Sequence, residues 1–225
     1  MALVVILLGA PGAGKGTQAA RLAQARSLPH VSTGDLLRDH KARGTPLGKE
    51  AQGYMDKGEL VPDALVLDML AQRVSLPDCS EGYVLDGFPR TDVQARALEQ
   101  RLKPSDQVQV VNLEVSDETI VARSAGRLSC PNQGCGRVYH AQSAPPRKAG
   151  VCDACGSELY QRADDAAPVV RERLRVYRQK TAPLVDFYAA RGRLTAIDGQ
   201  QSPEAVFAEL SALIGVNPIP GKVRR

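Results

Sequence analysis

A glycine-rich segment near the start of the chain, residues 9–17, has the composition of a phosphate-binding loop. It reads GAPGAGKGT, follows the apolar run 1–8 and leads into a helical pattern that begins at Lys15. Backbone N–H groups presented by glycines, the positive end of a helix and a lysine ammonium group all attract phosphate oxygens. The usual pattern has a hydroxyl directly after the lysine, whereas here Gly16 takes that position and Thr17 follows. The segment therefore predicts a nucleotide-binding site in which Lys15 and the backbone contribute more than Thr17.

Four of the five cysteines form two close pairs, which predicts a metal site. Four residues separate Cys130 from Cys135, two separate Cys152 from Cys155, and Cys79 stands alone. Two thiolate pairs can complete a closed tetrahedral shell around Zn²⁺, and a small segment without a large core needs such a cross-link. Disulfides and unliganded thiols are the alternatives, but the odd cysteine count and the lack of an export signal favour a reducing cytoplasm. We therefore predict a structural zinc site in a cytoplasmic protein, with Cys79 as an inert thiol.

The composition is that of a globular chain with one substantial domain. With 225 residues, of which 43% are apolar and 24% charged, the chain can bury a large core. The apolar run at residues 1–8 has no basic segment before it, and it is far shorter than the ~20 residues of a membrane-spanning helix. The formal net charge of +4 is mild, and an enzyme that binds several phosphates needs arginines in any case. These features predict neither a membrane nor a nucleic-acid partner.

Apolar runs and helical patterns alternate along most of the chain. Repeated βα units of this kind are typical of a parallel sheet covered by helices on both faces. We expect turns at 32–35 and 87–90, and a long helix after residue 165 that Pro183 kinks or splits and Gly192 ends. The expected strands are 1–8, 30–31, 82–86, 108–115 and 194–197. The expected helices are 15–26, 36–43 and 47–57, with further helices that begin after residues 62, 91, 116 and 202.

One region interrupts this alternation. Residues 126–165 are rich in Pro, Gly and Cys and contain only short strand-like pieces. We expect them to form a small insert that divides a core domain into residues 1–125 and 166–225. The last residues, 215–225, have the composition of a basic, frayed tail.

Four separated motifs resemble those of the adenylate kinase family, over residues 3–214. The motifs are GAPGAGKGTQ at 9–18, STGDLLR at 32–38, DGFPR at 86–90 and YQRADD at 160–165. The resemblance implies a P-loop-type α/β fold with a five-stranded parallel sheet flanked by helices. It also implies two mobile parts, an AMP-binding segment at 32–61 and a lid at 126–165, which is zinc-ribbon-like here. The implied activity is reversible, Mg²⁺-dependent phosphoryl transfer, ATP + AMP = 2 ADP, by a monomer that maintains the adenine nucleotide balance.

The same resemblance implies roles for individual residues. Contacts to ATP are implied for Gly12, Ala13, Gly14, Lys15, Gly16, Thr17, Arg123, Arg127, Val138, Tyr139 and Gln201. Contacts to AMP are implied for Thr33, Arg38, Glu59, Leu60, Val61, Gly87, Phe88, Pro89, Arg90, Gln94, Arg162 and Arg173. The implied catalytic side chains are Lys15, Arg90, Arg127, Arg162 and Arg173. Asp86 would hold the water shell of Mg²⁺, and Asp164 and Asp165 would organise closure of the lid.

The residue types agree with phosphoryl transfer to a phosphate acceptor. Because a phosphate monoester is already ionised at neutral pH, the reaction needs no general base, only positioning and cancellation of charge. Arginine suits this task because its fork meets phosphate oxygens bidentately and stays charged. An open site would let water compete for the phosphoryl group, which is a physical reason for a lid. His30, His40 and His140 receive no role.

Two other functions remain open from the sequence. One is a related kinase that acts on UMP, CMP or GMP, or that uses GTP. Thr33 and Gln94 favour AMP because hydroxyl and amide groups suit the edge of adenine. The other is a zinc-ribbon protein that binds nucleic acid, which the cysteines and the basic charge permit. Such a module exposes aromatic residues or a basic stripe, whereas the insert has only Tyr139 and Tyr160, and the phosphate loop would serve no purpose.

Overall fold

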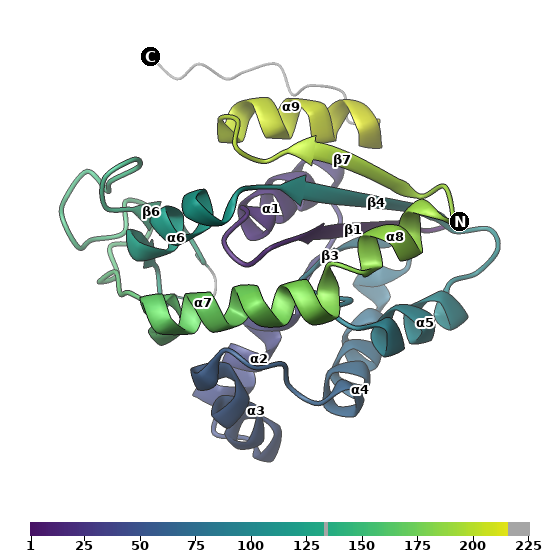
Figure 1. The fold of residues 1–225 in the computed structure, drawn as a ribbon, viewed down its shortest axis with the longest axis horizontal. Helices are drawn as coiled ribbons and strands as arrows, with labels where there is room; N and C mark the ends of the chain where they lie inside the picture. The colour runs from purple at the N-terminus through teal and green to yellow at the C-terminus, as the bar shows by residue number, and fades with distance from the viewer. Residues whose placement is uncertain (133–134, 216–225) are drawn as a thin grey trace.

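The computed structural model describes residues 1–132 and 135–215 (Figure 1). Apart from Gly215, the predicted tail lies outside these residues. The described chain is built on a five-stranded sheet in which all neighbouring strands are parallel, as predicted. In spatial order the strands are β2 (His30–Ser32), β3 (Gly82–Asp86), β1 (Leu3–Gly9), β4 (Gln107–Glu114) and β7 (Leu194–Asp198).

Strand β1 lies at the centre of this sheet and is buried along its whole length. Its side chains alternate between two hydrophobic clusters, one on each face. Val4, Ile6 and Leu8 pack into the first cluster, whereas Val5 and Leu7 pack into the second. Burial on both faces explains why this strand is a continuous apolar run in the sequence.

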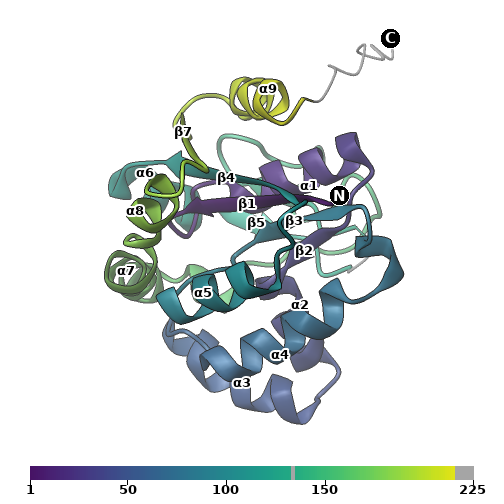
Figure 2. The same cartoon turned by 90° about the vertical axis from the view of Figure 1, so that its right-hand side faces the viewer.

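Helices cover both faces of the sheet (Figure 2). The second cluster is completed by α1 (Lys15–Arg26) and α9 (Pro203–Ile214). The first cluster is completed by α2 (Thr33–Ala42), α3 (Pro46–Lys57), α4 (Asp63–Val74), α5 (Asp92–Arg101) and α8 (Leu184–Ala189). Two further helices, α6 (Asp117–Ala125) and α7 (Ala167–Val176), pack against each other through Ile120, Val170 and Leu174.

Hydroxyl side chains fix where several helices begin. Thr91, Ser116 and Ser202 each accept a hydrogen bond from a backbone N–H in the first turn of α5, α6 and α9, as the sequence predicts. The segment 32–35 differs from its prediction as a turn. Ser32 accepts the N–H of Asp35 and is itself a cap, so these residues form the first turn of α2.

The predicted long helix is split into two, with Pro183 between the parts. Helix α7 continues into a π-helical turn, Tyr177–Thr181, and α8 follows. Helix α8 stops at Ala189, and Gly192 closes the turn that follows, as predicted. Gly192 has a positive φ of 64°, and the N–H of Arg193 donates to the carbonyl oxygen of Tyr188 at 3.2 Å.

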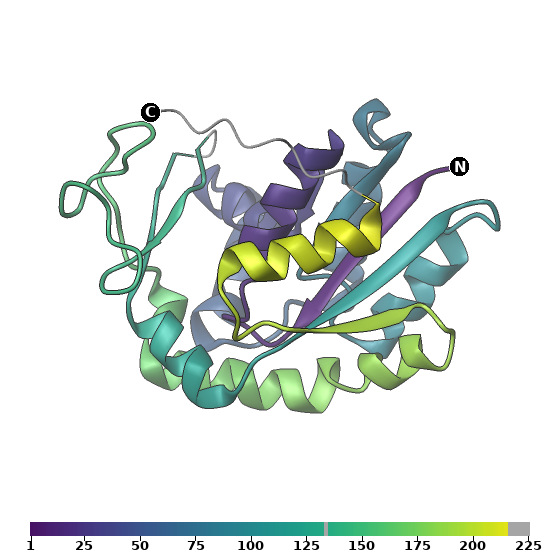
Figure 3. The same ribbon diagram turned by 90° about the horizontal axis from the view of Figure 1, so that it is seen from above.

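The insert at 126–165 has little regular structure and projects from one end of the molecule (Figure 3). Strands β5 (Arg127–Ser129) and β6 (Val138–His140) form a small antiparallel sheet. Its interior is a separate cluster in which Cys130, Cys152 and Leu159 are the buried members. One 3-10 turn, Ala163–Asp165, ends the insert, and another, Pro77–Cys79, lies between α4 and β3. Among the described residues, no helix combines the length and the apolar character needed to cross a membrane.

Candidate active site

A cavity of about 1780 Å³ lies beyond the carboxyl ends of β1, β2 and β3. This is the edge of a parallel sheet at which ligands usually bind. Every residue that the sequence assigns to ATP, AMP or Mg²⁺ lines the cavity except Phe88. Phe88 is 1% exposed and packs into the first hydrophobic cluster, so Gly87 and Pro89 are the parts of its turn that face the cavity. The fold thus brings segments that are far apart in the chain into one connected site.

The phosphate loop joins β1 to α1 at the floor of the cavity. Gly14 immediately precedes α1 and has a φ of 97°, a backbone conformation that residues other than glycine rarely adopt. Lys15 donates hydrogen bonds from Nζ to the carbonyl oxygens of Gly9 and Ala10, at 2.7 and 2.8 Å. Burial lowers the pKa of Lys15 to about 8, although the nearby carboxylate of Asp86 opposes this shift. A bound phosphate would raise this pKa again and keep the lysine charged at higher pH.

Asp86 ends strand β3 and stands directly beside the loop. A Cβ atom on Gly16 would lie 3.2 Å from its Oδ2 atom, which is tighter than ordinary van der Waals contact. A side chain at position 16 would therefore crowd the carboxylate of Asp86, which is a physical reason for glycine there. Burial alone would raise the pKa of Asp86, but His30, Lys15 and Arg90 together hold it below its usual value. Asp86 therefore presents a negative charge to the cavity at neutral pH.

His30 is a residue of this site that the sequence analysis left without a role. Its Nε2 atom lies 3.6 Å from Oδ2 of Asp86. The same nitrogen is buried and has no hydrogen-bond partner among the described residues. The one available signal was a polar residue within the short apolar strand β2, which pairs in parallel with β3.

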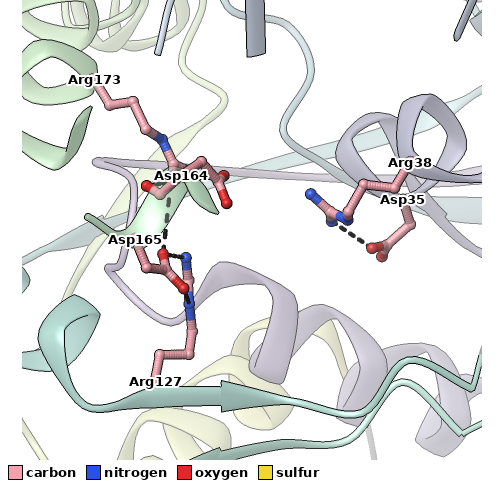
Figure 4. Close-up of polar contacts among 6 residues, drawn as sticks. All are labelled: Asp35, Arg38, Arg127, Asp164, Asp165 and Arg173. Carbon is pink, nitrogen blue, oxygen red and sulfur yellow. Dashed lines mark hydrogen bonds and ion pairs between the residues drawn. The ribbon is translucent and has the colours of Figure 1, made fainter. Parts of the chain in front are cut away.

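Arginines and aspartates face one another where the insert meets the core (Figure 4). Arg127 donates from Nε to Oδ2 of Asp165 at 2.8 Å, which joins the two ends of the insert. Arg173, on α7, donates from Nη1 to Oδ2 of Asp164 at 2.9 Å. Figure 4 shows these pairs on one side of the view and the pair of Arg38 with Asp35 on the other. The base of the insert is thus closed by one ion pair and tied to α7 by another.

The cations of the cavity are crowded. Burial lowers the pKa of Arg90, and burial together with Arg38 and Arg127 lowers that of Arg162. Burial lowers the pKa of Arg173 to about 10, even though Asp164 opposes the shift. The Nε atom of Arg162 is also buried with no hydrogen-bond partner in the described chain. Desolvated, mutually repelling cations with a spare donor are stabilised when a polyanion enters.

The residues assigned to AMP form a hydrogen-bonded network at the far side of the cavity. Thr33 donates from Oγ1 to the carbonyl oxygen of Gly87 at 2.8 Å. Gln94 is 2% exposed and holds its neighbours at both ends of its amide. Its Oε1 accepts the backbone N–H of Arg90, and its Nε2 donates to Oδ1 of Asp63, each at 2.8 Å. Asp63 was not singled out from the sequence, although it anchors this wall.

The remaining residues assigned to ATP come from α6, β6 and the loop before α9. Arg123, Val138 and Gln201 all line the cavity. Tyr139 lines it too, and its hydroxyl accepts the N–H of Asp153 at 2.9 Å. The insert therefore contributes a wall of the cavity as well as its own small interior.

The sulfur atoms of Cys130, Cys135, Cys152 and Cys155 lie within 4.8 Å of one another. Cys130 Sγ is 3.4 Å from Cys155 Sγ, and Cys135 Sγ is 3.6 Å from Cys152 Sγ. All five cysteines are free, so no disulfide forms. A Zn–S bond of about 2.3 Å in a tetrahedron places sulfur atoms about 3.8 Å apart, so the cluster fits a zinc ion. The longer spacing of the first pair does not prevent this convergence.

A phosphate loop at the switch point of a parallel sheet, facing a second anion pocket across buried arginines, defines a P-loop kinase that acts on a phosphorylated acceptor. A sequence model of the adenylate kinase family matches residues 7–193. An adenylate kinase of Archaeoglobus fulgidus is 50% identical over 212 residues, which cover 93% of this chain and 97% of that protein. Those of Lachnospira eligens and Caldicellulosiruptor bescii are 47% and 49% identical, over 94% of this chain and 99% of each relative. The chain belongs to the adenylate kinase family and is a nucleoside monophosphate kinase.

Proposed function

We propose that the protein is an ATP:AMP phosphotransferase that catalyses ATP + AMP = 2 ADP. The observation that carries this proposal is that the phosphate loop and the pocket formed by Thr33, Arg38 and Arg90 line the same cavity. Two nucleotides can therefore meet with their phosphates between the loop and the arginines. The names of the relatives point to the same reaction.

In this proposal the chain acts by positioning and by cancelling charge. Lys15 and the backbone of 12–17 bind the phosphates of ATP, while Arg38 and Arg90 bind the phosphate of AMP. Arg127, Arg162 and Arg173 surround the group in transfer and stabilise its negative charge in the transition state. No side chain removes a proton, because the acceptor phosphate is already ionised.

Mg²⁺ bound together with ATP would neutralise part of the charge on the phosphates. Asp86 fits this ion, since it is a single ionised carboxylate beside Lys15, and Mg²⁺ bound to phosphates keeps several waters and needs only one or two carboxylates. Asp86 would orient those waters, and Thr17, one residue beyond the usual hydroxyl position, would contact phosphate or ion less directly.

We infer that residues 126–165 act as a lid and residues 32–61 as an AMP-binding segment, on a core of 1–125 and 166–225. The insert has its own small cluster, its ends are joined by Arg127 and Asp165, and Arg173 ties it to α7 through Asp164. Movement about these pairs would exclude water from the transferring group. The sulfur geometry supports zinc as the metal that holds the lid together.

We also infer a cytoplasmic monomer. The cavity is formed by residues of one chain, and its cysteines are free thiols. Light scattering should give a mass near the 24.1 kDa of a single chain.

A panel of acceptors tests the proposed reaction. The enzyme is assayed with Mg-ATP and AMP, UMP, CMP or GMP, and the same panel is run with Lys15→Met. We expect AMP to be the preferred acceptor and Lys15→Met to lose nearly all transfer. Faster turnover with UMP or CMP would overturn the choice of AMP, and equal activity of the variant would remove Lys15 from its role.

A further inference from the structure

A buried threonine that neither the motifs nor the proposed mechanism uses contacts the active site. Thr181 is 8% exposed and lines the cavity. It ends the π-helical turn Tyr177–Thr181, whose wide hydrogen bond joins the N–H of Ala182 to the carbonyl oxygen of Tyr177 at 2.9 Å. Such turns are rare and occur frequently at functional sites.

The hydroxyl of Thr181 holds the backbone of a distant residue. Its Oγ1 donates to the carbonyl oxygen of Arg90 at 2.8 Å, across 91 residues of sequence. The N–H of Arg90 is held in turn by Oε1 of Gln94 at 2.8 Å. Both backbone polar groups of Arg90 are therefore fixed by side chains from different elements, while Nε of its guanidinium donates to the carbonyl oxygen of Gly87 at 2.7 Å.

The π-helical turn explains how Thr181 reaches this position. One extra residue in a turn rotates the side chains that follow by about 100° relative to a regular helix. The turn continues directly from α7, which carries Arg173. Arg90 lies close enough to Arg173 to lower its pKa. A single helical segment therefore sets the position of Arg173 directly and that of Arg90 through Thr181.

We infer that Thr181 is a positioning residue for phosphoryl transfer, whose hydroxyl fixes Arg90 in register with Arg173 around the transferring group. This inference rests on the proposed function, since it requires Arg90 to contact phosphate. Arginines that repel each other hold a productive arrangement only when their backbones are restrained, and small displacements of catalytic groups are costly.

The first test compares kcat and KM of three variants in the ATP and AMP assay. Thr181→Val keeps the shape and removes the hydroxyl, so we expect kcat to fall about tenfold while KM for ATP changes less than about twofold. Thr181→Ser restores the hydroxyl and should recover at least about half of the activity. Thr195→Val makes the same chemical change on β7, away from the cavity, and should behave as wild type. If Thr181→Val does not fold, Thr181→Ala provides the hydroxyl-free variant.

The second test separates positioning from a structural role. In an Arg90→Lys background, Thr181→Val should lower kcat by less than a further factor of about two, because the guanidinium that Thr181 positions is gone. Losses that multiply in the double variant would overturn the inference, as would Thr181→Val activity within about twofold of wild type. If neither wild type nor Thr195→Val transfers phosphate to AMP, the proposed function itself fails, whatever the Thr181 variants show.

Discussion

The carboxylate of Asp86 lies 3.2 Å from the point where a Cβ atom would stand on Gly16. Glycine at position 16, where the usual phosphate loop has a hydroxyl residue, thus leaves room for the carboxylate of Asp86 from the neighbouring strand β3. The loop and the end of β3 must be considered as one site.

Gly16→Ser should displace the carboxylate of Asp86. We expect kcat to fall about tenfold or more, because a displacement near the reacting atoms costs far more than its size suggests. Gly53→Ala is a suitable control, since a Cβ atom on this helical glycine would meet nothing within 4 Å. The control should retain activity and gain up to about 1 kcal/mol in the free energy of unfolding. Wild-type kcat in Gly16→Ser would show that Asp86 is not confined by the loop.

ATP binding should weaken as pH rises through about 8. The pKa of Lys15 is lowered to about 8 by burial, so the free enzyme loses the charge that attracts phosphate above this pH. The profile of kcat/KM for ATP reports ionisation of the free enzyme and should fall there. The lowered pKa of Lys15 also reduces the free energy of unfolding below about pH 8, where the lysine is charged in both states. This loss disappears as the pH rises from about 8 towards 10.5, the pKa of the lysine in the unfolded chain.

Lys15→Arg provides the control for this profile, because arginine stays charged. Its affinity for ATP, measured by calorimetry, should not change between about pH 7 and about pH 9. A flat wild-type profile over the same range would exclude Lys15 as the titrating group.

Asp165→Asn should loosen the base of the insert at 126–165. Asp165 is 2% exposed, pairs with Arg127 and lies 3.9 Å from Nη1 of Arg173, so the substitution leaves buried cations with a weaker partner. We expect the free energy of unfolding to fall by about 2 kcal/mol, seen as a lower Tm. Asp92→Asn removes an exposed partner of Arg96 and should change stability by less than about 0.5 kcal/mol. Equal effects of the two changes would mean that burial of the pair at Asp165 contributes nothing.

Purified protein should contain about one zinc ion per chain. Cys152→Ser should lower this content and make the insert at 126–165 sensitive to protease, as should a strong chelator. Cys79→Ser changes a buried cysteine that is not part of the cluster and should retain zinc. A metal-free protein whose insert resists protease would refute a structural metal site.

The sequence predicted those parts of the fold that depend on neighbouring residues. Thr91, Ser116 and Ser202 cap the helices that follow them, and each signal lies within four residues of its effect. The continuous apolar run of β1 predicted a strand buried on both faces. The phosphate loop and the four cysteines were recognisable because their spacing along the chain carries the chemistry.

Contacts between distant segments had no such signal. Thr181 and Arg90 meet only because the segment after α7 and the turn after β3 are folded together. His30 faces Asp86 because β2 and β3 are paired. Phe88 belongs to a motif whose position implied a nucleotide contact, yet its ring is buried in the core. The direction of a side chain in an irregular turn depends on packing against distant residues, so the neighbouring sequence does not predict it.

The two-sided burial of β1 has a consequence for how the protein opens. Because β1 contributes side chains to both hydrophobic clusters, neither cluster can unfold while the other keeps its native packing. The sheet and its helices should therefore behave as a single foldon in hydrogen exchange, with the slowest amides in β1. The insert shares neither cluster and has only its cysteine-lined interior. Its amides should exchange through separate, lower-energy fluctuations that leave the phosphate loop in place.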